Sequence, residues 1–264
     1  MDYEVTLDKE ILSQNKIALA RAITLTLEDE GFRQKVCELC LPYSSRALRI
    51  GIAGPPGAGK SSLIRELIGY FLEKEKKVAV LSNDPVDKRT GGAFLADRLE
   101  YQQYTSHKRF YARSIATNEE YDIHPVTPSI MALCAYAGYD VIIVESTGLG
   151  QRSLTLPEYC NIFIWVTTPF FGGPMQVIKT DWQLKPADII VITRGDILFE
   201  LCNYAAAVIE RTLAEIKADK KAEVKVDVNN VKIVSVGLRD RKNLDEFFSI
   251  LEEVIKKKFP GFYR

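Results

Sequence analysis

The first part of the chain carries hydrophobic residues at helical spacing. From Leu19 to Leu27 large apolar side chains recur every four residues, which predicts one buried face of a helix. We expect Asn15 or Ser13 to cap the start of this helix and Gly31 to end it. A second helix is predicted over residues 32–41, because the proline that follows cannot continue it.

Beyond residue 46 the pattern changes to short apolar runs separated by helical segments. The predicted strands are residues 47–53, 77–82, 140–145, 162–168, 188–193 and 231–236. Amphipathic helices are predicted between most of them, including residues 60–74 and 244–258. Because the strands are continuous runs of Val and Ile rather than alternating ones, they favour a parallel sheet covered on both faces. We therefore expect an α/β fold with a helical cap over residues 1–45 and one domain over residues 46–264.

Composition narrows the class of protein. The 264 residues are 47% hydrophobic and 27% charged, which is typical of a globular domain and excludes disordered and collagen-like chains. Thirty-five basic residues balance thirty-five acidic ones, so no basic excess points to nucleic acid. An acidic-polar start, no apolar run of about 18 residues and five cysteines indicate a cytoplasmic protein without membrane partners or disulfides.

The sequence GPPGAGKS matches the phosphate-binding pattern G-x-x-x-x-G-K-[ST] between a predicted strand and a predicted helix. This context predicts a P-loop NTPase, in which backbone N–H groups and a helix N-terminus surround phosphate oxygens. Lys60 is expected to reach the β- and γ-phosphates, and the Ser61 hydroxyl to bind Mg²⁺. The predicted phosphate-binding residues are Gly54, Pro55, Gly57, Ala58, Gly59, Lys60, Ser61 and Ser62.

Acidic residues follow two of the predicted strands. Asp84 comes just after the second strand, and Asp97 ends a glycine-containing segment. Either carboxylate could hold Mg²⁺, directly or through water, or orient the attacking water; the alternative is a solvated loop acid. Glu145 ends a hydrophobic strand, where a Walker B acid would sit, and Gly148 has the spacing of the glycine whose N–H meets a γ-phosphate.

A further segment contains Gln176 and Lys179, three residues apart after a Gly-Gly-Pro sequence. These side chains could act on the nucleotide or on a partner, or simply lie on a helix surface.

The segment TRGD, Thr193 to Asp196, stands where guanine-specific proteins carry N-K-x-D. Asp196 can accept hydrogen bonds from guanine N1–H and N2–H₂, and the stem of Arg194 can cover the base. Thr193 is too short to copy the asparagine fully, so GTP is favoured over ATP without being required. Backbone N–H groups of Ser235, Val236 and Gly237 are expected near guanine O6.

In their order the segments LARAIT, RALRIGIAGPPGAGKSS, AGYDVIIVESTGLGQ and Q..IK resemble the MeaB/ArgK-type GTPases of the SIMIBI class, over residues 16–248. The resemblance implies a cytosolic GTPase chaperone that uses Mg²⁺ and GTP/GDP. Such a protein binds a cobalamin-dependent mutase, for example methylmalonyl-CoA mutase, or its cofactor-loading enzyme, and gates cofactor delivery or protects the mutase. By position, Asp84, Asp97 and Glu145 match the Mg²⁺-side acids.

By the same resemblance Gln176 and Lys179 match a switch loop that couples partner binding to hydrolysis, and Asp196 matches the guanine-reading acid. We see no intrinsic arginine finger, so slow hydrolysis is expected without a partner. The chain stops soon after its last predicted helix, so we expect no dimerisation arm, and a homodimer stays open.

Three alternatives remain at this point. They are a nickel metallochaperone GTPase of the hydrogenase or urease type, an ATP-using kinase, and a module that binds nucleotide without hydrolysing it. The pair Cys37 and Cys40 is interpreted as packing, because no second Cys or His pair stands nearby.

Overall fold

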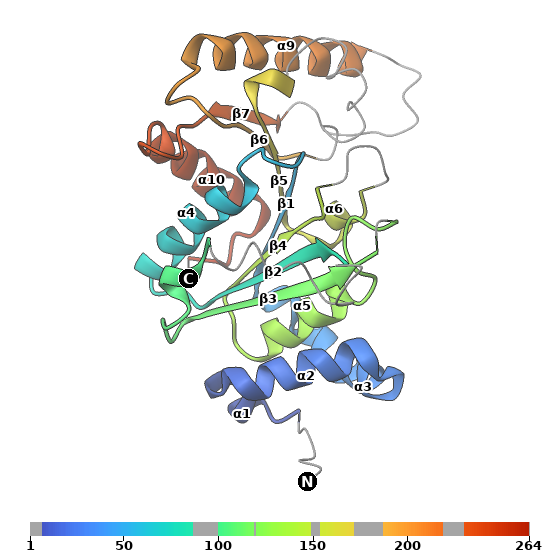
Figure 1. Ribbon diagram of the computed structural model, residues 1–264. Helices are drawn as coiled ribbons and strands as arrows, with labels where there is room; N and C mark the ends of the chain where they lie inside the picture. The colour runs from blue at the N-terminus through green and yellow to red at the C-terminus, as the bar shows by residue number, and fades with distance from the viewer. Residues whose placement is uncertain are drawn as a thin grey trace. The chain divides into compact units, whose positions relative to one another are not determined.

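The computed structural model describes residues 7–86, 100–118, 120–148, 154–171, 187–218 and 230–263 (Figure 1). The chain divides into two compact units. The first unit comprises Met1–Arg49 and Ile64–Thr147, and the second comprises Ile50–Leu63 and Gly148–Arg264. The division passes through strand β1 and helix α4, so each of these elements contributes residues to both units. Their bounds are Leu48–Ala53 for β1 and Lys60–Glu73 for α4.

The first unit begins with four helical segments, α1 (Lys9–Gln14), α2 (Lys16–Glu28), α3 (Glu30–Cys40) and the 3₁₀ helix η1 (Leu41–Arg46). Asn15 caps α2 as expected, since its side chain accepts hydrogen bonds from the N–H groups of the first turn. Asp29 ends α2 and also caps α3, because its carboxylate accepts from the Phe32 N–H. The prediction that Gly31 ends the helix was therefore wrong, and Gly31 lies inside α3.

The first unit continues with three strands, η3 (Gln102–Tyr104) and helix α5 (Thr127–Tyr136). Strand β2 (Val78–Pro85) pairs in parallel with both β3 (Phe110–Thr117) and β4 (Val141–Glu145). Figure 1 shows α5 between these strands and the N-terminal helices, and most of its side chains are buried. The N-terminal helices therefore complete a core around α5.

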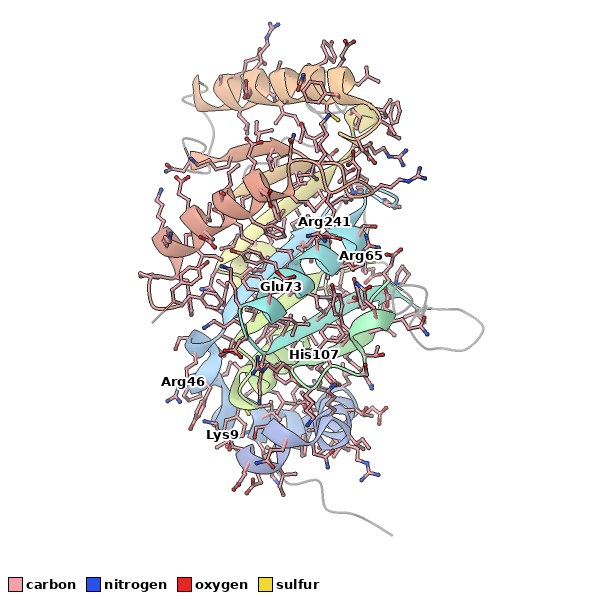
Figure 2. The ribbon with its side chains drawn as sticks, turned by 90° about the vertical axis from the view of Figure 1, so that its left-hand side faces the viewer. Lys9, Arg46, Arg65, Glu73, His107 and Arg241 are labelled. Carbon is pink, nitrogen blue, oxygen red and sulfur yellow. The ribbon has the colours of Figure 1, made fainter. Side chains whose placement is uncertain are left out.

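Beside them Lys9 and Arg46, labelled in Figure 2, both lie over the Tyr43 ring, at 4.7 and 4.4 Å from its centroid.

The second unit contains the other parallel strands, in the order β1, β5 (Ile162–Thr167), β6 (Ile189–Ile192) and β7 (Lys232–Ser235). Its helices are α6 (Leu156–Tyr159), η4 (Pro169–Phe171), α9 (Phe199–Ala218) and α10 (Leu244–Lys258). Helix α10 packs against β5 and β7. Its bounds are those predicted from the sequence, and the six predicted strands lie within three residues of their expected bounds.

Across the part of the chain that the structure describes, seven strands form one sheet. The predicted α/β fold with a parallel sheet and helices is confirmed. Strand β3 was not predicted, and the boundary between residues 45 and 46 stays a prediction. Among the described helices, none combines the length and apolarity needed to cross a membrane.

Candidate functional site

The phosphate loop, residues 54–61, joins β1 to α4 inside the second unit. Its glycines are required by the backbone. Gly54 has φ 154°, and a Cβ there would collide with the carbonyl oxygen of Val166. Gly59 has φ 91°, and a Cβ there would lie 3.3 Å from Thr193 Cγ2. Only glycine takes both positions without strain, so the loop keeps the conformation that its motif predicted.

The loop closes on itself beneath the start of α4. The N–H of Ala58 donates to the carbonyl of Pro55 at 3.2 Å, and Lys60 Nζ donates to the same carbonyl at 3.4 Å. Lys60 is only 8% exposed, which is unusual for an ammonium group, and within the described residues it forms no ion pair with a carboxylate. Its other N–H donors, together with the N-terminus of α4, provide positive charge beside the loop.

Three further residues of the predicted site lie at the two ends of the phosphate loop. Ser61 and Ser62 stand half-buried in the first turn of α4, where their hydroxyls follow Lys60. Gly148 lies against the other end of the loop, since a Cβ on it would come 3.1 Å from Pro56 Cγ. A larger side chain at residue 148 would press on the phosphate loop.

The TRGD loop, residues 193–196, is tied to the phosphate loop through Thr193. The buried Thr193 hydroxyl lies 2.8 Å from the Ala58 carbonyl and 3.1 Å from the Thr167 carbonyl, and it donates to them. From the sequence we regarded this threonine as too short to replace asparagine. In the structure this short side chain instead connects strands β5 and β6 to the phosphate loop by hydrogen bonds.

Asp196 lies beside the loop that follows β7. A Cβ on Gly237 would come 2.8 Å from Asp196 Cβ, and the N–H of Gly195 donates to the Val236 carbonyl at 2.9 Å. Arg194 is exposed, has φ 69°, and places its guanidinium 6.0 Å from the Phe170 ring centroid. The structure thus brings both predicted base-reading segments together in the second unit.

The N–H groups expected near guanine O6 already have protein partners. Val236 N–H donates to the Ile192 carbonyl at 2.8 Å, and Gly237 N–H donates to the Lys242 carbonyl at 2.9 Å. A bond from either group to a base would require these hydrogen bonds to be exchanged. The role of Ser235 stays a prediction; its own carbonyl accepts from Asn243 Nδ2 at 3.0 Å.

The strand-end acids Asp84 and Glu145 lie in the first unit. They are 5% and 4% exposed, and they come at the carboxyl ends of the neighbouring strands β2 and β4, where Ser82 pairs with Glu145. Carboxylates are the hard oxygen donors that Mg²⁺ prefers. This donor chemistry fits the predicted metal.

Sequence reasoning missed Asn83, a buried amide at the end of β2. Its Nδ2 donates to the Glu145 carbonyl at 3.0 Å. Its Oδ1 accepts from the hydroxyls of Thr117 and Thr127, at 3.2 and 3.0 Å, and from the His124 N–H at 2.9 Å. One side chain therefore holds β3, β4 and the start of α5 together. The signal in the sequence was a polar residue directly after an apolar strand.

A second missed group is Tyr101, whose buried hydroxyl donates to Glu145 Oε2 at 3.2 Å. Asp97, Gln176 and Lys179 lie outside the described residues, so their roles stay predictions.

The structure also describes the cysteine pair. Cys40 is buried, and burial raises the pKa of its thiol to about 12. The Sγ of Cys37 lies 3.3 Å from the Ser129 hydroxyl. In the described ranges, no group of three or more His, Cys, Asp or Glu side chains is placed to hold a metal ion.

Comparisons with known proteins give the family. A family model described as methylmalonyl Co-A mutase-associated GTPase MeaB matches residues 19–255. The chain is 36% identical over 188 residues to the fused isobutyryl-CoA mutase of Geobacillus kaustophilus, covering 67% of this chain and 17% of that protein. It is 30% identical over 264 residues to the mitochondrial methylmalonic aciduria type A homolog of Caenorhabditis elegans, covering 93% and 64%.

A solved structure supports the fold. The crystal structure of LAO/AO transport system kinase superposes with a TM-score of 0.69 at 21% identity, covering 96% of this chain and 76% of that one. The chain spans less than two thirds of the length of the two curated relatives above. Because the family model covers most of the sequence, the chain belongs to the MeaB family of methylmalonyl-CoA mutase-associated GTPases.

Proposed function

We propose that this protein binds GTP with Mg²⁺ and hydrolyses it slowly on its own. The observation that carries the proposal is the phosphate loop with its buried Lys60, tied by Thr193 to the loop that contains Asp196. Lys60 and the α4 N-terminus would neutralise charge on the β- and γ-phosphates. Phosphoryl transfer to water needs little more than such positioning and charge neutralisation.

Mg²⁺ would be held by the Ser61 hydroxyl, with Asp84, Asp97 and Glu145 as the acids on its side. When bound, the metal supplies positive charge to the phosphate oxygens. The protein's own part is to hold these carboxylates in place: the Tyr101 hydroxyl donates to the Glu145 carboxylate, and Asn83 donates to the Glu145 backbone carbonyl. Guanine preference would come from Asp196, whose carboxylate can accept from N1–H and N2–H₂.

The partner in this proposal is a cobalamin-dependent acyl-CoA mutase, together with its cofactor-loading enzyme, in the cytoplasm. The family description names a mutase, and a similar segment occurs within a fused isobutyryl-CoA mutase. GTP turnover would gate cofactor delivery or protect the loaded mutase. In this scheme Gln176 and Lys179 couple the partner to hydrolysis, and residues 1–45 form a cap on the domain at 46–264.

The test is GTP turnover by the purified chain, alone and with a purified cobalamin-dependent acyl-CoA mutase. We expect slow turnover alone, a clear increase with the mutase, and loss of both in Lys60→Ala. A preference for ATP would favour a kinase instead, and tight GTP binding without turnover would favour a binding module. Stoichiometric nickel binding together with stimulation by a hydrogenase or urease maturation protein would replace the mutase with a different client.

A further inference from the structure

The first unit contains a cavity of about 380 Å³ that involves none of the predicted nucleotide-binding residues. Its walls come from the start of α2, the segment around η3, and β3. The residues that matter are Lys16, Tyr101, Thr105, Phe110, Tyr111 and Arg113. Its volume lies within the range of small-molecule sites, about 300–1,000 Å³.

One cation of the cavity is Lys16, which fixes part of its rim. Lys16 Nζ donates to the carbonyls of His107 and Thr105, at 2.8 and 3.3 Å. An ammonium group has three donors, and the described contacts use two of them. Burial lowers the pKa of Lys16, so the ammonium is partly removed from water. Figure 2 labels His107, whose carbonyl accepts one of these hydrogen bonds.

The second cation is Arg113, on β3. Its Nη2 donates to the Thr24 hydroxyl at 3.0 Å, while its Nε is buried and finds no hydrogen-bond acceptor among the described residues. Within the same part of the chain, neither Lys16 nor Arg113 forms an ion pair with a carboxylate. A buried N–H without an acceptor is costly, and a bound anion would supply the missing acceptor once the guanidinium turns toward the cavity.

The remaining wall is aromatic. Tyr101 and Phe110 are 2% and 1% exposed, and Tyr111 is also buried. Because the protein covers nearly all of each ring, an apolar body would contact only the ring edges that face the cavity. Two uncompensated cations beside an aromatic wall are complementary to a molecule that has both a negative and an apolar part.

We propose that this cavity binds a small organic anion, in which one carboxylate or phosphate group carries an aromatic or branched aliphatic body. The anionic group lies between Lys16 and Arg113, and the body lies against Tyr101 and Phe110. Arg113 presents a planar guanidinium that suits either head group through two parallel hydrogen bonds.

Tyr101 connects the cavity to the strand-end acid, since its hydroxyl donates to Glu145 Oε2. Binding of the anion against the Tyr101 ring therefore changes GTP turnover. This second part rests on the proposed GTPase function, whereas binding to the cavity does not.

The test uses the full chain saturated with GDP, so that added anions do not report on the nucleotide site. Phenylacetate, phenyl phosphate, the neutral phenylacetamide and the cationic phenethylamine are titrated by ligand-observed NMR. We expect at least one of the two anions to bind. The neutral and the cationic analogue should each bind with an affinity at least about tenfold lower. Which anion binds more tightly distinguishes a carboxylate ligand from a phosphate ligand.

Variants locate the binding. Arg113→Gln and Lys16→Gln should each weaken the anion about tenfold, with thermal unfolding measured to confirm folding, and Arg113→Lys should retain more affinity than Arg113→Gln. Arg109→Gln is the matched control, because Arg109 is exposed, pairs with Glu75 and does not line the cavity. Equal binding of phenylacetate and phenylacetamide, no binding of either anion up to about 10 mM, or unchanged affinity in folded Arg113→Gln would each overturn the site.

The link to Glu145 has its own readout. In the wild type, adding the anion should change the GTP turnover rate. In Tyr101→Phe the anion should bind with little change in affinity, but the turnover rate of this variant should be the same with and without the anion. Binding without any effect on turnover would overturn the link and leave the site standing. An absence of GTP turnover in all samples would instead contradict the proposed GTPase function, while the NMR titration still decides the binding site.

Discussion

The hydroxyl of Thr193 donates to the backbone carbonyl of Ala58 at 2.8 Å, so one side chain connects the TRGD loop to the phosphate loop. The same hydroxyl reaches the Thr167 carbonyl at the end of β5. The loop proposed to bind phosphate and the loop proposed to read the base are therefore joined at a buried residue. We expect a change at either loop to affect the other through this contact.

Removing this hydroxyl should affect both loops. Thr193→Val keeps the shape but leaves the Ala58 and Thr167 carbonyls without this donor, which should lower the free energy of unfolding by about 1–3 kcal/mol. GTP affinity should fall in parallel. Thr193→Ser keeps the donor and should stay closer to wild type in both urea unfolding and GTP titration. Equal behaviour of the two variants would show that the hydroxyl is not the connection.

Asp196 should decide which base is bound. In Asp196→Asn one acceptor becomes an amide donor, so guanine N1–H and N2–H₂ lose a partner and GTP affinity should fall by about 10- to 100-fold. The same amide matches the 2-oxo group of xanthine, so affinity for xanthosine triphosphate should rise. Competition titrations with GTP, xanthosine triphosphate and ATP measure this. An unchanged GTP affinity would mean that Asp196 does not read the base.

Lys60→Ala should lower the GTP turnover rate by about 100-fold or more, because it removes the buried charge that we propose neutralises the phosphates. GTP affinity should also fall, since the ground state carries the same phosphate charge. Lys74→Ala, an exposed lysine after the end of the same helix, is the matched control and should behave like wild type. Single-turnover hydrolysis with labelled GTP separates binding from chemistry.

Asn83→Ala should be strongly destabilising, because it leaves the Glu145 carbonyl and the hydroxyls of Thr117 and Thr127 without their shared partner. We expect a loss of about 2–4 kcal/mol in the free energy of unfolding. Asn118→Ala changes an exposed asparagine just after β3 and should cost little. Urea denaturation followed by circular dichroism compares the two, and similar midpoints would contradict the role given to Asn83.

His124 should make stability depend on pH. Its Nδ1 accepts from the Val126 N–H at 3.2 Å, which requires a neutral ring. Burial, and then the charge of Arg33, lower the pKa of His124 below its ordinary value of about 6.5. The folded state therefore binds fewer protons than the unfolded state just below that pH, so stability is present above about pH 6.5 and is lost as the pH falls towards the folded pKa.

His124→Asn keeps an acceptor for Val126 but does not titrate, so its melting temperature should fall less than that of the wild type between about pH 7.5 and 5.5. His107 offers the control, because its Nδ1 accepts from the Arg109 N–H in the same local arrangement on an exposed loop. His107→Asn should keep the wild-type pH dependence. Identical acid profiles for His124→Asn and wild type would rule out this residue as the cause.

The sequence predicted those parts of the fold in which one strong local pattern decides the structure. The six apolar strands and α10 follow from Val and Ile runs and from helical spacing. Strand β3 was missed because Phe110–Thr117 contains Arg113 and Ser114 between its apolar residues, and among the described strands it pairs with β2 alone. Its strand conformation comes from pairing with β2, which is not a local property.

In the candidate site, too, the sequence predicted the features that depend on local conformation and missed those that depend on distant contacts. The phosphate loop was predictable because Gly54 and Gly59 are required by the backbone itself. The roles of Asn83, Thr193 and Tyr101 were not, because each depends on a hydrogen bond to a residue far along the chain. The backbone N–H groups of Val236 and Gly237 likewise donate to other protein carbonyls, which the sequence did not predict. An N–H group expected near the base can therefore already be used in a hydrogen bond within the protein.

The two compact units are interleaved along the chain, which crosses from one to the other after Arg49, Leu63 and Thr147. Neither unit corresponds to one uninterrupted stretch of gene. A truncation therefore cannot yield either unit intact, and a recombination event that replaces one unit must cut within β1 and within α4. Because the segments of the two units alternate along the chain, grafting one unit onto another protein would carry part of the other unit with it.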